Sequence, residues 1–167
     1  MQLKYRLYEE TDMKPSIVIG LDTQGRGQYI EKEGFERYEQ KAMGAYVVFS
    51  RNYAMAGNLG FHLGLNKNLF ENSDGDEDIN LFLGLDKEIN RSISLMIEYD
   101  AMLNDNNNEY DYEDLSLGKG IGYVNAGLRW SISDNLLLEL NFNDINRNQK
   151  ISETAHREFK ILYSQKF

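Results

Sequence analysis

The sequence predicts an all-β fold, an antiparallel up-and-down β-barrel with about nine strands in the chain. Apolar and polar residues alternate with a period of two from one end of the chain to the other, and no segment shows an apolar stripe at the 3.6-residue spacing of a helix. The connections between the alternating segments are short and long in turn. These features favour a single β domain over residues 1–167.

Nine alternating segments justify the strand count. The fourth is the clearest, because Leu59, Phe61, Leu63 and Leu65 alternate with glycine, histidine and asparagine. Each segment approaches the roughly 9–11 residues with which a tilted strand crosses a membrane. The segments cover residues 3–7, 16–22, 43–50, 59–66, 79–86, 92–103, 124–132, 136–143 and 159–167.

The two faces of these strands differ in a way that favours a membrane barrel. One face is uniformly aliphatic or aromatic, with aromatic residues near the segment ends, as in the interfacial girdles of transmembrane barrels. A soluble sheet carries mainly Lys, Glu and Thr on its polar face. Here the second face mixes small, bulky and charged residues, which suits the lumen of a narrow barrel; it includes Gly20, Gly60, Gly64, Gly84, Gly127, Tyr46, Phe82, Met96, Glu98, Arg129 and Glu139.

The connections alternate in length throughout. The short ones lie near residues 10–14, 53–58, 87–91 and 133–135, and the long ones are 23–40, 67–78, 104–122 and 143–155. Outer-membrane barrels place tight turns on the periplasmic side and long loops outside. A soluble meander has no reason to keep this alternation, because both of its ends face the same solvent.

Composition excludes several other classes. The net charge of −9 argues against binding to nucleic acid, whose phosphates require a basic surface. The absence of cysteine removes disulfides, thiolate metal sites and cysteine nucleophiles. No apolar run approaches the roughly 20 residues of a membrane helix. The residues after Met1 form no signal peptide, so we expect either a removed signal or a start inside a longer protein.

The last strand resembles the closing strand of bacterial outer-membrane barrel proteins. Phe159, Ile161, Tyr163 and the terminal Phe167 alternate on one face, although Gln165 stands where an apolar residue is more usual. The resemblance implies a location in the bacterial outer membrane, contact with its lipid, and recognition of this strand by the barrel-assembly machinery.

A second resemblance covers roughly residues 15–66. It consists of the run Pro15–Asp22, the Gly25/Gly27 loop, the segment Tyr46–Arg51 and the segment Leu59–Leu65, which resemble the repeated hairpins of the YjbH-like barrel family. This resemblance implies a link to exopolysaccharide secretion and envelope maintenance. It transfers no catalytic residue.

Strand parity leads us to expect an incomplete barrel. If Phe167 ends in the periplasm, the first segment starts outside, whereas barrels of this kind start inside and have even strand numbers. We therefore expect the C-terminal part of a larger even-stranded barrel, with an odd number of strands before Gln2. The alternative is that residues 2–9 form an edge or insertion and eight strands close alone.

The candidate chemical groups are few. His62 and His156 are the neutral-pH bases, and neither has a serine and a carboxylate at a recognisable spacing, so a lumen hydrogen-bonding role is favoured for His62. Arg6 also belongs to the inward charges. Glu98 and Arg129 are expected to pair across adjacent strands. The inward polar groups are expected either to fill the lumen or to form a selectivity lining. The lumen-lining candidates are His62, Glu98, Asp100, Arg129, Glu139 and Lys160.

Two loop motifs point to weaker alternatives. The acidic run at residues 72–78 has carboxylates around Gly75, as a Ca²⁺ loop would, but it lacks the EF-hand spacing, so a solvated loop is favoured. Gly25-Arg26-Gly27 is not a phosphate cradle, since no helix follows it.

The sequence thus predicts a non-enzymatic, porin-like outer-membrane barrel of a Gram-negative-type bacterium, without a cofactor or metal. It would act in envelope polysaccharide export or small-solute passage, with a polysaccharide or small solute as partner. One alternative is a soluble up-and-down barrel that binds an apolar ligand inside. The other is an outer-membrane barrel enzyme acting on lipid or peptide.

Overall fold

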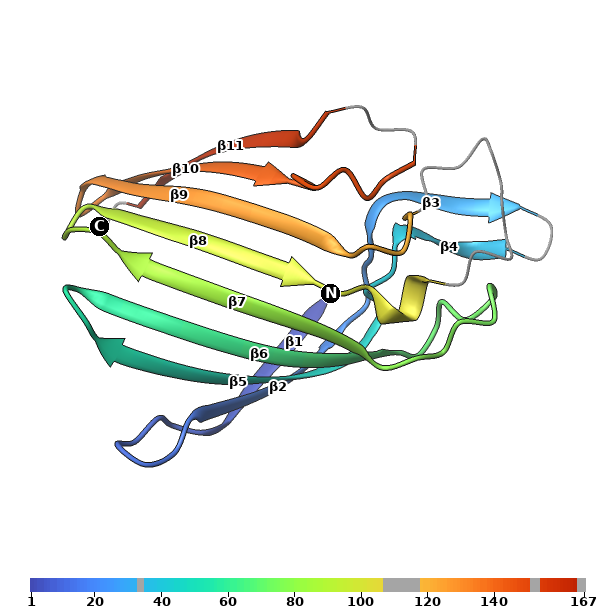
Figure 1. The fold of residues 1–167 in the computed structure, drawn as a ribbon, viewed down its shortest axis with the longest axis horizontal. Helices are drawn as coiled ribbons and strands as arrows, with labels where there is room; N and C mark the ends of the chain where they lie inside the picture. The colour runs from blue at the N-terminus through green and yellow to red at the C-terminus, as the bar shows by residue number, and fades with distance from the viewer. Residues whose placement is uncertain (33–34, 107–117, 151–153, 165–167) are drawn as a thin grey trace.

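The fold is described from a computed structural model, which describes residues 1–32, 35–106, 118–150 and 154–164. These residues form an all-β, antiparallel structure with one short 3-10 helix. Nine of the described strands make one main sheet in the order β1-β2-β5-β6-β7-β8-β9-β10-β11, and β3 pairs with β4 in a separate hairpin. Figure 1 shows the main sheet bent into a trough.

The strands of the main sheet match the nine alternating segments of the sequence. They are β1 (Gln2–Tyr8), β2 (Ser16–Asp22), β5 (Gly44–Ala54), β6 (Asn58–Asn68), β7 (Asn80–Glu88), β8 (Ile93–Asp100), β9 (Tyr123–Ser133), β10 (Leu136–Asn143) and β11 (His156–Tyr163). Each strand pairs with its neighbours along the chain, apart from the β3–β4 insertion. The predicted all-β, antiparallel class is confirmed.

The register aligns the alternation of all nine strands. Val47 of β5 lies opposite Ile19 and Leu65, and Leu128 of β9 lies opposite Leu95 and Leu140. The same alignment continues from β1 to β11, so the apolar residues form one continuous face and the polar residues form the other. A slip of one residue would move a strand's whole apolar set to the other face.

The short and long connections separate to opposite ends of the sheet, as the sequence predicts. The turns between β1 and β2, β5 and β6, β7 and β8, and β9 and β10 lie at one end. The long connections lie at the other end, at the right of Figure 1, beside the hairpin. The first end is called the turn end below, and the second the loop end.

The main sheet is open within the described residues. β1 and β11 are its two edges, and no described ladder joins them. Because all neighbouring strands are antiparallel, the first and the ninth strand of the sheet run in the same direction, from the loop end to the turn end. The nine described strands therefore do not form a closed ring, and the gap between β1 and β11 is the one that strand parity predicts.

The expectation that residues 23–40 form an irregular loop is wrong. This connection contains β3 (Arg26–Lys32) and β4 (Phe35–Gln40), a hairpin that lies at the loop end in Figure 1. A single turn of 3-10 helix, η1 (Leu103–Asp105), lies at the same end and contacts β7. The hairpin was missed because its strands, RGQYIEK and FERYEQ, lack the polar and apolar alternation of the main sheet.

No helix among the described residues has the length and apolar character required to cross a membrane.

Candidate functional site: the concave polar face and its loop cap

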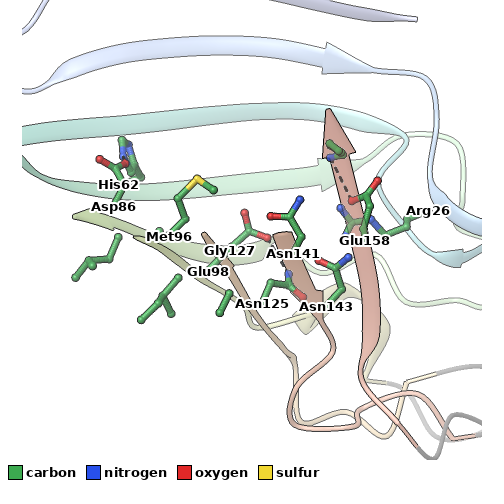
Figure 2. A pocket seen from close by; sticks show the side chains of 15 residues that line it. Arg26, His62, Asp86, Met96, Glu98, Asn125, Gly127, Asn141, Asn143 and Glu158 are labelled. Carbon is green, nitrogen blue, oxygen red and sulfur yellow. Dashed lines mark hydrogen bonds and ion pairs between the residues drawn. The ribbon is translucent and has the colours of Figure 1, made fainter. Parts of the chain in front are cut away.

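The polar face of the main sheet encloses a cavity of about 310 Å³. Six successive strands, β6 to β11, supply its walls, and Arg26 of the hairpin reaches it from the loop end. A cavity shared by so many neighbouring strands requires that the polar face lie on the inside of the bend. Figure 2 shows polar side chains from these strands around a common space; the labelled ones include His62, Asp86, Glu98, Asn125, Asn141, Asn143 and Glu158.

Three of the predicted lumen residues line this cavity. They are His62 of β6, Glu98 of β8 and Lys160 of β11. Glu98 accepts a hydrogen bond of 3.0 Å from the Asn125 amide, and Lys160 forms a 3.2 Å ion pair with Glu158. The residues that line the cavity therefore carry charges of both signs, and Glu98 and Lys160 each have a polar partner in the lining.

The other three predicted lumen residues lie elsewhere on the same face. Arg129 and Glu139 are opposite each other on β9 and β10 and form a 2.6 Å ion pair. The expected pairing of Glu98 with Arg129 is wrong, because the register places Arg129 opposite Ser94. Asp100, at the loop end of β8, accepts a 2.6 Å hydrogen bond from Asn80.

His62 has partners that the sequence spacing did not reveal. Its Nδ1 lies 2.7 Å from the Ser50 Oγ, and its Nε2 lies 2.5 Å from the Asp86 Oδ1. Ser50 is the direct cross-strand partner of His62, whereas Asp86 is opposite Gly60, two residues along β6. The three side chains are separated by 12 and 24 residues in sequence, so only the register of β5, β6 and β7 brings them together.

A second cavity of about 370 Å³ lies between the hairpin and β9–β11. Arg26, Asn125, Asn143, Glu158 and Lys160 line both cavities, so the two spaces adjoin. The hairpin thus bounds the polar interior at the loop end. Arg26 pairs with Gln40 through the backbone of the hairpin. His156 lines the same cavity and bonds Gln149 at 2.6 Å.

The hairpin is fixed by a buried charge cluster, called the loop cap below and formed by Arg37, Lys41, Glu71, Asp74 and Asp105. Only 1% of the Arg37 surface is exposed. Its guanidinium donates to Asp74 at 2.6 Å and to both carboxylate oxygens of Asp105 at 2.6 and 2.8 Å. It also donates to the backbone carbonyls of Tyr38 and Glu39. All five donors of a guanidinium lie in one plane, so this geometry joins three loops rigidly.

Lys41 and Glu71 complete the loop cap. The Lys41 ammonium donates to Asp74 at 2.7 Å and to the Asp76 carbonyl at 3.0 Å. The Glu71 carboxylate accepts from the backbone N–H groups of Tyr38, Ala42 and Met43, and from the Asn68 amide. Buried ions persist only when they are paired and hydrogen-bonded in this way.

The loop cap overturns the expectation that residues 72–78 form a solvated acidic loop. Asp74 and Asp76 are buried, and the Asp74 carboxylate forms ion pairs with Arg37 and Lys41. Burial raises the pKa of the Asp105 carboxyl above its usual value, and the Arg37 guanidinium opposes that rise. No group of three or more metal-ligating side chains suited to an ion occurs among the described residues.

Asparagine side chains join the two remaining long loops. The Asn148 carboxamide oxygen accepts from the backbone N–H groups of Lys119 and Ile121, at 3.0 and 3.1 Å. The Asn146 amide bridges Val124 and Gly122. The buried Asp144 carboxylate accepts from the N–H groups of residues 148 and 149. Backbone groups that lack ladder partners are thereby satisfied by short polar side chains.

The apolar face of the main sheet is uncovered by any described segment. Leu63, Leu83, Leu95 and Leu128 are each 37–44% exposed, although Leu63, Leu83 and Leu128 lie in the middle of their strands. The buried apolar residues instead lie at the loop end, at Ile30, Phe35, Met102 and Tyr123.

The predicted assembly-signal residues share this outer face where the structure describes them. Phe159, Ile161 and Tyr163 of β11 are 60–66% exposed, and β11 is an edge of the main sheet. Phe167 lies outside the described residues. Recognition by an assembly machinery remains a prediction.

Comparisons with protein-family models, with curated proteins and with solved structures found no match.

Sequence reasoning missed two groups of functional interest, for different reasons. Ser50 and Asp86 are ordinary members of the polar face, and the available signal was their position on the two strands that flank the strand of His62. Arg37 and Lys41 lie in a connection that was predicted to be a loop, and the run FERYEQ over residues 35–40 has no alternation that would have revealed a strand.

Proposed function

We propose that this chain is a β-barrel domain of a bacterial outer membrane, whose apolar face contacts lipid and whose polar face surrounds a hydrophilic interior. The interior would hold or pass small polar solutes, in small-solute passage or envelope polysaccharide export. The proposed function, a lipid-facing apolar face around a polar interior, requires no cofactor.

The continuous exposed apolar face carries the proposal. It extends across all nine strands of the described sheet, and its mid-strand leucines have no covering element in the described chain. Soluble proteins rarely expose contiguous apolar patches larger than a few hundred Å². In lipid the same face is favourable, and the backbone of the paired strands is already satisfied.

The polar interior supports the second half of the proposal. The cavities of about 310 and 370 Å³ adjoin, and carboxylate, amide and cationic groups line both. Such a lining favours hydrated solutes over apolar ligands. The soluble-barrel alternative needs the apolar face turned inward, which is the opposite of the arrangement of these two faces.

Closure of a barrel places a condition on the proposal. β1 and β11 run in the same direction, so direct pairing between them would be parallel. An antiparallel ring that contains this sheet therefore needs an odd number of further strands between its two edges. Open edges in lipid would leave backbone groups unpaired, at a cost of several kcal/mol each.

Vesicle flotation tests the proposal. The purified chain is refolded from denaturant into preformed phospholipid vesicles and, in parallel, into buffer without detergent. We expect it to float with the vesicles and to aggregate in buffer. A monodisperse, folded chain in buffer that does not float would overturn the membrane assignment. Flotation without release of a trapped small sugar would overturn passage by this chain alone.

A further inference from the structure

The hydrogen-bonded series Ser50–His62–Asp86 on the concave face is not explained by a lipid-facing wall or a polar passage. A hydroxyl, an imidazole and a carboxylate in this order form the arrangement by which many hydrolases activate serine. The side chains of His62 and Asp86 are 32% and 38% exposed, and both line the cavity of about 310 Å³. The group is therefore ordered by hydrogen bonds, its imidazole and carboxylate face the interior, and Ser50 is only partly buried.

We propose that Ser50 is an activated nucleophile, with His62 as its general base and Asp86 as the residue that positions His62, and that the site cleaves carboxylic esters. This goes beyond the proposed function and revises the expectation of a non-enzymatic chain. It depends on the register of β5, β6 and β7 and not on the surroundings of the apolar face.

Hydrogen-bond roles fix the direction of the relay. Asp86, as a carboxylate, only accepts, so the His62 Nε2 carries the proton that bonds it at 2.5 Å. The His62 Nδ1 is then the unprotonated nitrogen, and it accepts from the Ser50 hydroxyl at 2.7 Å. Asp86 thereby holds the tautomer in which His62 can take a proton from Ser50.

The chemistry balances without any further reactant except water. The Ser50 Oγ forms a bond to the ester carbonyl carbon as its proton passes to the His62 Nδ1. The carbon–alkoxy bond then breaks, and His62 returns that proton to the departing alcohol. Water cleaves the acyl-serine by the same proton route, which gives a carboxylic acid and free Ser50.

The surroundings of the series bear on the substrate class. His62 and Asp86 line the polar cavity on the concave face. Ser50 and His62 also line a groove of about 460 Å³ that includes apolar residues such as Leu63 and Leu83. The polar cavity beside His62 and Asp86 favours the ester of a polar alcohol.

Two glycines leave room for the series. A Cβ at Gly60 would lie 2.6 Å from the Asp86 Oδ2, and one at Gly84 would lie 3.3 Å from the His62 Cβ. Side chains at these positions would displace the carboxylate or crowd the imidazole.

The same sheet limits the expected rate. Ser50 is paired on both sides, with Ser16 of β2 and His62 of β6, so its backbone N–H belongs to the ladder. Each backbone or side-chain donor to a reaction oxyanion contributes about 10²–10³-fold. We therefore expect both acylation by an ester and turnover to be slow, so that labelling of Ser50 requires a more reactive electrophile.

Covalent labelling tests the proposal. The refolded chain is treated with a fluorophosphonate probe, which forms an oxygen–phosphorus bond to an activated serine with loss of fluoride, and the labelled residue is located by mass spectrometry. We expect labelling at Ser50 and none in S50A. Ser94, which lies on the same face opposite Arg129, provides the matched control, so S94A should label like the parent chain.

Two further variants separate activation from mere exposure of the hydroxyl. H62Q keeps a hydrogen-bonding side chain without a base and should slow labelling about 10²–10⁴-fold, the range of general-base catalysis. D86N should slow it as well, because the amide stabilises the wrong imidazole tautomer, and D86E should restore part of the rate. Circular dichroism confirms that each variant has folded.

The outcomes are decisive. Absence of label at Ser50 in the folded chain, or equal labelling rates in the parent, H62Q and D86N, would overturn the proposal. Vesicle flotation would be unchanged in either case, so this failure is distinct from a failure of the membrane assignment.

Discussion

The loop cap and the strands of the main sheet are stabilised in opposite ways. The cap buries ions: Arg37 and Lys41 lie against Asp74 and Asp105 with almost no exposed surface. The middle of the sheet leaves its largest apolar side chains exposed and buries few of them. In water the first arrangement is ordinary and the second is unfavourable, because exposed apolar area costs roughly 25 cal/mol per Å².

This contrast fits the proposed membrane location, in which one chain meets both water and lipid. A hydrogen-bonded ionic core suits a water-facing cap, since its rim can be hydrated and its interior is fully paired. An exposed aliphatic wall suits lipid, where no apolar partner is needed. The boundary between the two regions lies near the loop ends of the strands, where Asn68, Asn80 and Asn104 are buried. The Asn104 amide donates to the Asn68 carboxamide oxygen, and the Asn80 carboxamide oxygen accepts from the Leu103 backbone N–H.

The largest effect is expected in the cap. Replacing Arg37 with Ala leaves the Asp74 and Asp105 carboxylates buried beside a single lysine, and breaking a buried ion pair costs about 3–5 kcal/mol. We expect fast amide hydrogen exchange in the hairpin and in residues 71–76, with the strand centres still protected. The control is Arg91→Ala, at an exposed turn-end position. Uniform exchange across cap and sheet would show that they are not separate regions.

A somewhat smaller effect is expected from a charge placed on the apolar face of the main sheet. Leu95→Arg puts a charge on the apolar face toward the turn end of β8, between Leu128 and Lys87, where lipid would make it cost up to about 2–4 kcal/mol. Ser94→Arg puts the same charge on the polar face one residue away and should cost less. The measurement is the free energy of unfolding in vesicles. Equal costs at the two positions would reverse the assignment of the faces.

Crowding on the concave face should be detectable at Gly64. A Cβ there would overlap the Phe82 ring, which leans over the glycine from β7. Overpacking of this kind costs about 1–3 kcal/mol. We expect Gly64→Ala to destabilise the sheet and Phe82→Leu to relieve much of the loss in the double variant. Additive losses in the two variants would place the Phe82 ring away from Gly64.

The smallest effect concerns the charges on β9 and β10. Arg129 and Glu139 pair at 2.6 Å, but Arg129 is 44% exposed, so a double-mutant cycle should give a coupling of about 0.2–1 kcal/mol. The parallel cycle between Glu98 and Arg129 should give none, because Glu98 bonds Asn125 instead. Coupling in the second cycle alone would contradict the register of β8 and β9.

The strands of the main sheet could be predicted well from the sequence and the loop cap only poorly, for a physical reason. Period-two alternation is a local signal, and in an antiparallel meander local strands also pair with their neighbours. The positions of Leu63, Leu83 and Leu95 on one face therefore followed from the sequence alone. The hairpin's Arg37 is held by Asp74 and Asp105, which are 37 and 68 residues away in the acidic loop and η1. No local pattern encodes that contact.

The candidate relay lies between these extremes. His62 was placed correctly on the inner face, yet its partners depend on the stagger of two neighbouring strands. A shift of two residues in either pairing would keep every side chain on its face and separate Ser50, His62 and Asp86. Sequence alternation determines the face of a residue but not its cross-strand neighbour.

Fluorescence of Trp130 tests the central claim most directly. It is the single tryptophan of the chain, it lies on the apolar face opposite Leu138 and Ile93, and it is 47% exposed. In vesicles we predict strong quenching by lipids brominated on their acyl chains and weak quenching by aqueous acrylamide. The urea-unfolded chain, in which acrylamide should quench freely, is the control. Strong acrylamide quenching with no response to brominated lipid would contradict a lipid-facing wall.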